Sequence, residues 1–227
     1  MNILVVGHGR MGRLVAAHAP AHGCAVTGII DDESGWAAFG EGQFDDAEIA
    51  VEFTEPDAVR RNLTRLASRG LSVVIGTTGW QEHEAELRRL VDEAGTGVLA
   101  AANFALGMYV FRSIVSEAAR RFAALEDVGA WIHETHHVAK KDAPSGTAVV
   151  LKDVMGAAGY GRHIDVASTR VGAVPGTHVV GFDGQAETVT LTHAVRDRAV
   201  FAHGALEGAR WLQGRRGWFG MEDMFRQ

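Results

Sequence analysis

Histidine, lysine and acidic residues gather in one short stretch of the sequence, from His133 to Thr147. It holds the adjacent pair His136 and His137, then Lys140, and it closes on the sequence P-S-G-T. A histidine that titrates near neutral pH and an ammonium group can relay protons and neutralise an anionic substrate. A helix that begins near Gly146 would add free backbone amides suited to a carboxylate. The stretch therefore predicts an active site that handles an anion.

The same stretch leaves other interpretations open. From His133 to His137 it matches H-E-x-x-H, which is a zinc-hydrolase motif when both histidines share one face of a helix. Residues 128–134 are typical of a strand, and no further cluster of ligands is evident, so we expect no metal. Surface histidines at a strand end are the second alternative. Arg198 offers a further fork for a carboxylate, although most single arginines are solvated.

A second candidate site is a glycine-rich stretch with the spacing G-x-G-x-x-G. An apolar run at 2–6 precedes it, a helical pattern at 13–22 follows it, and Asp31 comes 19 residues after the last glycine. This order is the dinucleotide-binding fingerprint, in which the loop approaches a pyrophosphate and the acid binds a ribose. A glycine turn without a ligand is the alternative. The residues expected to bind the dinucleotide here are Gly7, His8, Gly9, Arg10, Met11, Gly12 and Asp31.

Two further loops follow apolar runs at 72–75 and 97–102, and ligands of parallel sheets bind at the carboxyl ends of strands. Small residues in these loops would let the nicotinamide ribose lie against the backbone, although plain strand-to-helix turns are equally compatible with the spacing. The additional cofactor-binding candidates are Gly76, Thr77, Thr78, Ala101, Ala102, Asn103 and Phe104.

The elements that would position the glycine loop alternate between strand and helix patterns. Strands are predicted at 2–6, 25–30, 49–53, 72–75 and 97–102, and helices at 13–22, 56–69 and 80–93. Thr54 is expected to cap the helix that begins near Pro56, and 35–46 is expected to be a surface loop. Strands and helices at this spacing predict an α/β fold, a Rossmann-like doubly wound parallel sheet over residues 1–104.

The pattern changes after this region. A long helix is predicted at 104–122, a strand at 128–134, a helix at 147–156, and two strands at 177–182 and 188–193 joined by an Asp-Gly hairpin turn. These elements predict a second, smaller α+β domain with a mixed or antiparallel sheet over residues 105–204. A C-terminal helix at about 205–227 is expected to return to the first domain.

Length and composition limit the partners. The chain of 227 residues has room for one large or two small domains, and its net charge of −6 argues against nucleic acid or an acidic membrane surface as a partner. It contains no apolar run of 18 residues and no signal-peptide pattern, so we expect a soluble, cytoplasmic protein. The single cysteine, Cys24, cannot form an internal disulfide or a cysteine zinc site.

Residues 134–148 resemble the signature E-x-H-H-x-x-K-x-D-x-P-S-G-T-A of the 4-hydroxy-tetrahydrodipicolinate (dihydrodipicolinate) reductase family of bacterial lysine and diaminopimelate biosynthesis. Landmarks resembling that family also occur, in order, along nearly the whole chain. The sequence departs from the family by being shorter between Asp31 and Ile49. It also has Glu52 where aspartate is more common, and Ala105 where serine is common.

The resemblance implies a role for each residue of the histidine stretch. His136 would donate and accept a proton, Lys140 would donate one, and His137, Gly146 and Thr147 would contact the substrate. The implied reaction reduces a cyclic dicarboxylate to tetrahydrodipicolinate with loss of water, in a homotetramer. A dehydrogenase of another amino-acid-derived acid and a redox sensor without turnover are the alternatives.

The resemblance implies NADH or NADPH as the cofactor, and the residues after the second strand favour NADH. Asp31 would hydrogen-bond the adenosine ribose and repel the 2′-phosphate of NADPH, and Asp32 and Glu33 add negative charge. Arg10 and Arg13 are near enough in sequence to reach a 2′-phosphate, so we expect NADPH to remain usable.

Overall fold

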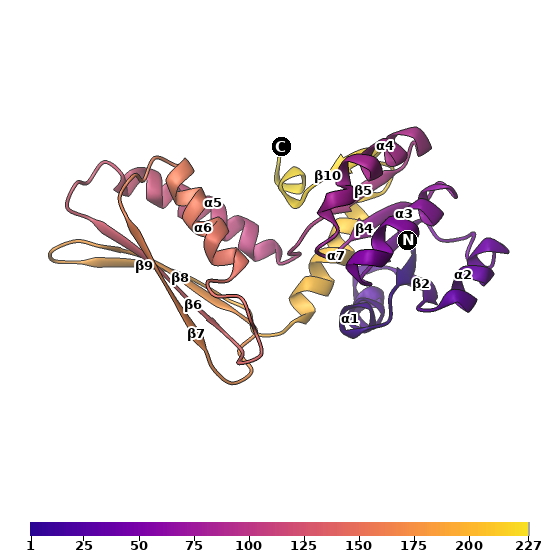
Figure 1. Cartoon of the computed structure of the whole chain (residues 1–227), viewed down its shortest axis with the longest axis horizontal. Helices are drawn as coiled ribbons and strands as arrows, with labels where there is room; N and C mark the ends of the chain where they lie inside the picture. Colours follow the sequence, from indigo (N-terminus) through magenta and orange to yellow (C-terminus); the bar gives the residue numbers. More distant parts are fainter. Residues whose placement is uncertain (227) are drawn as a thin grey trace. The chain divides into compact units, whose positions relative to one another are not determined.

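The computed structural model describes residues 1–226, and these divide into two units (Figure 1). The first unit comprises residues 1–105 and the C-terminal part of the chain from Ala199, and the second comprises Leu106–Arg198. Within the described residues, no helix is long and apolar enough to cross a membrane.

The first unit contains a six-stranded parallel sheet. Its strands are β1 (Asn2–Val6), β2 (Ala25–Ile30), β3 (Ile49–Glu52), β4 (Ser72–Ile75), β5 (Gly97–Ala100) and β10 (Gly217–Phe219). The strand order is β10-β5-β4-β3-β1-β2, so the chain reverses its direction of travel across the sheet between β2 and β3. Ligands of doubly wound sheets bind beside such a reversal, and the loop after β1 lies there. The predicted Rossmann-like class is confirmed.

Helices cover this sheet and bury its strands. They are α1 (Arg10–His18), α2 (Glu33–Gly40), α3 (Pro56–Ala67), α4 (Glu84–Ala94) and α7 (Ala199–Leu212), with short 3₁₀ turns at Ala19–His22, Gln81–His83 and Met221–Phe225. Leu4 and Val6 of β1 share one core with Leu63 and Leu66 of α3. Apolar strands buried in this way are typical of parallel sheets that helices cover on both faces.

Three local predictions in the first unit are wrong. Residues 35–40 are not part of a surface loop, because Asp32 accepts a hydrogen bond from the Gly35 amide and caps α2, which buries Trp36 and Phe39. Only residues 41–46 form turns at the surface. Thr54 does not cap α3, since its hydroxyl instead bonds the buried Glu52. The C-terminal region is not one helix: α7 ends at Leu212, and after residues 213–216 the chain forms β10 on the sheet edge.

The second unit contains a mixed four-stranded sheet, as predicted. Its strands are β6 (Gly129–His136), β7 (Ile164–Arg170), β8 (Thr177–Asp183) and β9 (Thr188–Ala194), in the order β7-β6-β8-β9. β6 and β7 are parallel, and the other neighbours are antiparallel. The helices α5 (Leu106–Phe122) and α6 (Gly146–Ala157) lie together on one face of this sheet (Figure 1).

The strand β6 is longer than the sequence pattern indicates. β7 has no predicted counterpart, because polar residues such as Asp165 and Ser168 interrupt its apolar pattern on a sheet edge. Its pairing extends β6 as far as His136, which lies opposite Arg170. Burial alternates along β6, so Glu134 and His136 lie on the same buried face as Ile132.

Candidate active site

The glycine loop joins β1 to α1 with little space between its backbone segments. Gly7 has φ +91°, and a Cβ there would lie 2.3 Å from the Phe53 carbonyl oxygen. A Cβ on Gly12 would lie 1.9 Å from the Gly7 carbonyl oxygen. Gly9 precedes α1 without a side-chain cap, and a Cβ on it would meet no atom within 4 Å. Packing therefore requires the first and third glycines, while the second borders open space at a helix N-terminus, where a phosphate fits.

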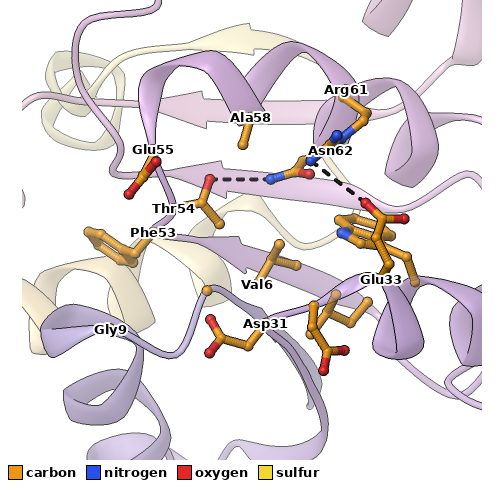
Figure 2. Close-up of a pocket in the computed structure, with 14 residues that line it drawn as sticks. Val6, Gly9, Asp31, Glu33, Phe53, Thr54, Glu55, Ala58, Arg61 and Asn62 are labelled. Carbon is orange, nitrogen blue, oxygen red and sulfur yellow. Dashed lines mark hydrogen bonds and ion pairs between the residues drawn. The ribbon is translucent and has the colours of Figure 1, made fainter.

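A cleft of about 440 Å³ opens beside this loop and is called the glycine-loop cleft here (Figure 2). Gly7, Gly9 and Asp31, which are predicted to bind the cofactor, line it on the side of β1 and β2. The His8 amide donates a 2.7 Å hydrogen bond to Asp31 Oδ1, which fixes this carboxylate at the end of β2. The volume lies within the range of small-ligand pockets. The residues present therefore fit the adenosine half of a dinucleotide.

The opposite wall of the cleft comes from the end of β3 and from α3. It includes Thr54, Glu55, Ala58, Arg61 and Asn62, none of which was predicted to contact the cofactor. Their signal in the sequence is weak. Thr54 and Glu55 precede α3, and Ala58, Arg61 and Asn62 lie on a helix whose position over the cleft depends on the sheet order.

The loops after β4 and β5 border a different, smaller hollow of about 150 Å³, which Thr77, Ala101 and Ala102 line. The Thr77 hydroxyl accepts a 2.8 Å hydrogen bond from the Thr54 amide, and its carbonyl accepts one from Trp80. The other predicted residues of these loops follow the same two strands; they are Gly76, Thr78, Asn103 and Phe104. None of the predicted residues of these two loops lines the glycine-loop cleft.

Phe104 is buried, and its ring packs edge-on against that of Phe53. A Cβ on Gly76 would lie 2.0 Å from the ring of Phe53. The Asn103 side chain accepts a hydrogen bond from the Ala105 amide. Through these contacts, the loop residues help to hold the strand ends together.

A buried carboxylate organises the second unit. Glu134 is fully buried, and Arg170 donates hydrogen bonds of 2.9 and 2.7 Å to its two oxygens. The Ser145 amide donates another of 3.2 Å, and His136 Nδ1 contacts Oε2. Burial would raise the pKa of Glu134, but hydrogen bonds from Arg170, Ser168 and His136 outweigh it and hold this pKa at about 2. Glu134 is therefore an anion at neutral pH.

This carboxylate orients the ring of His136. An anion beside Nδ1 favours the tautomer in which Nδ1 carries the proton and Nε2 is free to act as a base. Gly176 makes room at Nε2, because a Cβ there would approach this nitrogen to 3.0 Å. Burial lowers the pKa of His136, and the anion of Glu134 opposes that shift. A histidine held in this way is suited to general acid–base catalysis.

A second histidine supports the start of α6. The hydroxyl of Ser145 accepts a 3.2 Å hydrogen bond from the Ala148 amide and lies 3.1 Å from His178 Nε2. Burial lowers the pKa of His178 to about 4, so its ring is neutral at pH 7. The group of Glu134, His136, Ser145, Arg170 and His178 is called the glutamate cluster below.

The loop between β6 and α6 carries the other predicted residues. Lys140 is half-buried, and its Nζ donates a 2.8 Å hydrogen bond to Asp142, which lowers the pKa of that carboxyl. His137 directly follows β6, while Gly146 and Thr147 are the first residues of α6. The structure thus brings all five predicted catalytic and substrate residues to one loop and the element ends beside it.

The zinc interpretation lacks its geometry. His133 lies within β6 on the face opposite His136, and its Nε2 is 2.9 Å from the Thr169 hydroxyl. The helical arrangement required by the motif is therefore absent. No group of three or more histidine, cysteine or acidic residues in the described part of the chain is arranged to hold a metal ion.

Sequence reasoning missed most of the glutamate cluster. Glu134, Ser145, Arg170 and His178 were not predicted as site residues. The burial alternation of β6 is the signal that could have identified Glu134, since a carboxylate on a buried face requires a cationic partner. Arg198, noted as a possible carboxylate fork, ends the second unit with a buried Nε that has no hydrogen-bond partner in the described structure.

The fold and the two sites define an oxidoreductase class: a Rossmann-type sheet for a nicotinamide dinucleotide, with a separate unit that carries ionisable groups. The family model "Dihydrodipicolinate reductase, N-terminus" matches residues 1–104, and "Dihydrodipicolinate reductase, C-terminus" matches residues 107–225. The chain belongs to the dihydrodipicolinate reductase family.

Individual proteins agree with this assignment. A 4-hydroxy-tetrahydrodipicolinate reductase of Christiangramia forsetii is 31% identical, over 99% of this chain and 97% of that protein. The protein of the same name from Natronomonas pharaonis is 34% identical, over 98% of this chain and 99% of its own length. The structure of a dipicolinate-bound dihydrodipicolinate reductase from Paenisporosarcina sp. TG-14 superposes with a TM-score of 0.81 at 20% identity, covering 99% of both chains. The last similarity shows the shared fold.

Proposed function

We propose that this chain reduces 4-hydroxy-tetrahydrodipicolinate to tetrahydrodipicolinate with loss of water, in lysine and diaminopimelate biosynthesis. The observation that carries the proposal is the Glu134–His136 pair, which lies where β6 leads into the loop of Lys140 and the start of α6. The names of the similar reductases support the substrate. The dipicolinate bound to the Paenisporosarcina reductase supports a cyclic dicarboxylate as the substrate class.

The start of α6 supplies groups for a carboxylate. The helix begins at Gly146, and the Cβ position of this residue is open space, so a ligand can approach the backbone closely. The free amides of a helix N-terminus favour negative charge. His137 and Thr147 would add side-chain contacts beside them. These three residues therefore bind and orient the substrate.

His136 and Lys140 hold the protons that the reaction needs. When bound, a nicotinamide would supply a hydride to the conjugated imine that remains after the 4-hydroxyl group leaves as water, and a positioned acid would supply the proton that balances this hydride. Lys140 carries an ammonium group in the substrate loop, and Asp142 orients it. Glu134 keeps the His136 ring in one orientation, so its Nε2 can accept or return a proton. The family resemblance supports the same two roles.

The first unit would hold the cofactor, with NADH favoured and NADPH usable. The glycine loop and Asp31 would bind the pyrophosphate and the adenosine ribose. Gly76, Thr77, Thr78 and the 101–104 loop would lie at the nicotinamide end. We also propose that residues 1–104 act as the dinucleotide-binding domain and that the second unit, Leu106–Arg198, acts in substrate binding and oligomerisation. The boundary predicted at residue 204 falls inside α7, which belongs to the first unit. A cytoplasmic homotetramer is proposed from the family resemblance, and light scattering coupled to size exclusion tests the assembly.

A steady-state assay tests the proposed function. The purified protein is mixed with 4-hydroxy-tetrahydrodipicolinate and NADH or NADPH, and the absorbance of the reduced nicotinamide is followed. We expect turnover with both cofactors. Turnover only with aspartate or homoserine and the oxidised cofactor would identify another dehydrogenase. Nucleotide binding without turnover of any of these substrates would identify a sensor.

A further inference from the structure

The glycine-loop cleft contains a cation opposite its acidic wall. Arg61 projects from α3 into the cleft, while Asp31 and Glu33 lie on the facing side (Figure 2). The guanidinium lies 3.8 Å from Glu33, and the two side chains keep 59% and 69% of their surface exposed. An exposed ion pair of this length contributes about 0–1 kcal/mol, so another anion can replace Glu33 at little cost.

The other arginines near the cleft are already engaged or lie outside its lining. Arg13 Nε donates a 3.0 Å hydrogen bond to the His8 carbonyl oxygen, and Arg10 opens α1 without lining the cleft. Arg65 lies over the Trp36 ring, with its guanidinium carbon 5.0 Å from the ring centroid, and it also donates 3.4 Å hydrogen bonds to Glu33. Arg61 is therefore the cation best placed to meet a ligand in this cleft.

We propose that Arg61 is a specificity-determining residue that admits the 2′-phosphate of NADPH, and that Glu33 weakens this binding by competing for the guanidinium. The proposal rests on the proposed binding of the cofactor's adenosine half in this cleft. A guanidinium forms paired hydrogen bonds with a phosphate monoester, and Asp31 offers only repulsion to that group. Without Arg61, the wall that follows β2 would present its three carboxylates, Asp31, Asp32 and Glu33, to the 2′-phosphate.

Calorimetric titration with adenosine 2′,5′-bisphosphate and with adenosine 5′-monophosphate tests the proposal without any turnover. Arg61→Ala should weaken binding of the bisphosphate about tenfold, which corresponds to about 1.4 kcal/mol, and should change binding of the monophosphate less than about twofold. Glu33→Gln should strengthen bisphosphate binding. Arg60→Ala is the matched control, because Arg60 pairs with Glu86 at 2.7 Å and lies outside the cleft lining.

The outcomes separate this proposal from the proposed function. If Arg61→Ala and Arg60→Ala have equal effects on the affinity ratio of the two nucleotides, the role of Arg61 is wrong while the nucleotide site stands. If the wild-type protein binds neither nucleotide, the cleft is not an adenosine site and both proposals fail. A fall in the NADPH-to-NADH ratio of kcat/KM in Arg61→Ala, without a matching fall in Arg60→Ala, would support the proposal independently.

Discussion

The two sites of this molecule are built in different ways. The glycine-loop cleft consists of backbone and of charged side chains that remain in water, and its Arg61–Glu33 pair is long and exposed. The glutamate cluster is buried, and each oxygen of Glu134 accepts hydrogen bonds from more than one element. Water screens the charges of the first site, whereas the second must satisfy its charges internally.

Because of this difference, we expect substitutions at the two sites to have different consequences. Substitutions in the cleft should change which nucleotide binds while leaving the fold intact. Substitutions in the glutamate cluster should affect activity and stability together, because the groups that orient His136 also join β6, β7 and α6. The following variants test that contrast.

Lys140→Ala should have the largest effect on turnover. A positioned acid contributes about 10²–10⁴-fold, so we expect kcat to fall by that factor while nucleotide affinity stays unchanged. Lys141→Ala is the control, since Lys141 is the exposed neighbour in the same loop. Steady-state kinetics and nucleotide titration measure the two effects. Unchanged turnover in Lys140→Ala would exclude it as the acid.

Glu134→Gln should destabilise the protein by about 3–5 kcal/mol, because it leaves the largely buried Arg170 without its anion. Glu33→Gln removes the exposed anion that Arg61 and Arg65 share and should cost about 1 kcal/mol or less. Urea denaturation of both variants measures the free energies of unfolding. Equal losses would contradict the contrast between the two sites.

Substitutions of the adjacent residues His136 and His137 should affect turnover and substrate binding separately. His136→Gln is expected to lower kcat about 10²-fold or more, since it removes the group proposed to transfer a proton. His137→Gln should mainly raise KM, because it removes a contact proposed to be made to bound substrate and transition state alike. Steady-state kinetics of the two variants compare these effects. The opposite pattern would exchange the assignments.

The pKa of His178 predicts how stability depends on pH. Burial lowers this pKa from 6.5 to about 4, so the neutral ring stabilises the folded state fully above pH 6.5. That contribution is lost as the pH falls towards 4, by about 2 kcal/mol at pH 5. Glu134 adds to the loss only below pH 4.5, where its unfolded form takes up a proton.

The variant His178→Gln tests this origin of the acid sensitivity. Glutamine does not titrate, and its carbonyl can still accept a hydrogen bond from Ser145. Urea denaturation at pH 7 and pH 5 should show a smaller loss of stability in the variant than in the wild-type protein. Equal losses would assign the acid sensitivity to other groups.

Local sequence patterns predicted the parts of the molecule that depend on neighbouring residues. The glycine loop could be predicted because its tight turn and the strand before it lie within a dozen residues. The short helix α2 was missed because the burial of Trp36 and Phe39, rather than a long apolar period, stabilises it. The carboxylate of Glu134 was missed because its partner Arg170 is 36 residues away on a strand with a polar pattern. The position of Arg61 over the cleft likewise depends on the order of the strands.

The smallest effect on catalysis is expected at Asp31. Its carboxylate accepts a hydrogen bond from the His8 amide and lines the cleft. The lone pairs that this bond leaves free can accept hydrogen bonds from ribose hydroxyls, and the negative charge repels a 2′-phosphate. Asp31→Ser keeps an acceptor for that amide but removes the charge, so it should narrow the preference for NADH by about tenfold, or about 1.4 kcal/mol. Combined with Arg61→Ala, it shows whether the two residues act independently, since additive changes in the NADPH-to-NADH ratio of kcat/KM indicate separate contacts. A wild-type protein that prefers NADPH tenfold would show that the charge of Asp31 does not set the preference, and the paired variants would then show whether Arg61 does.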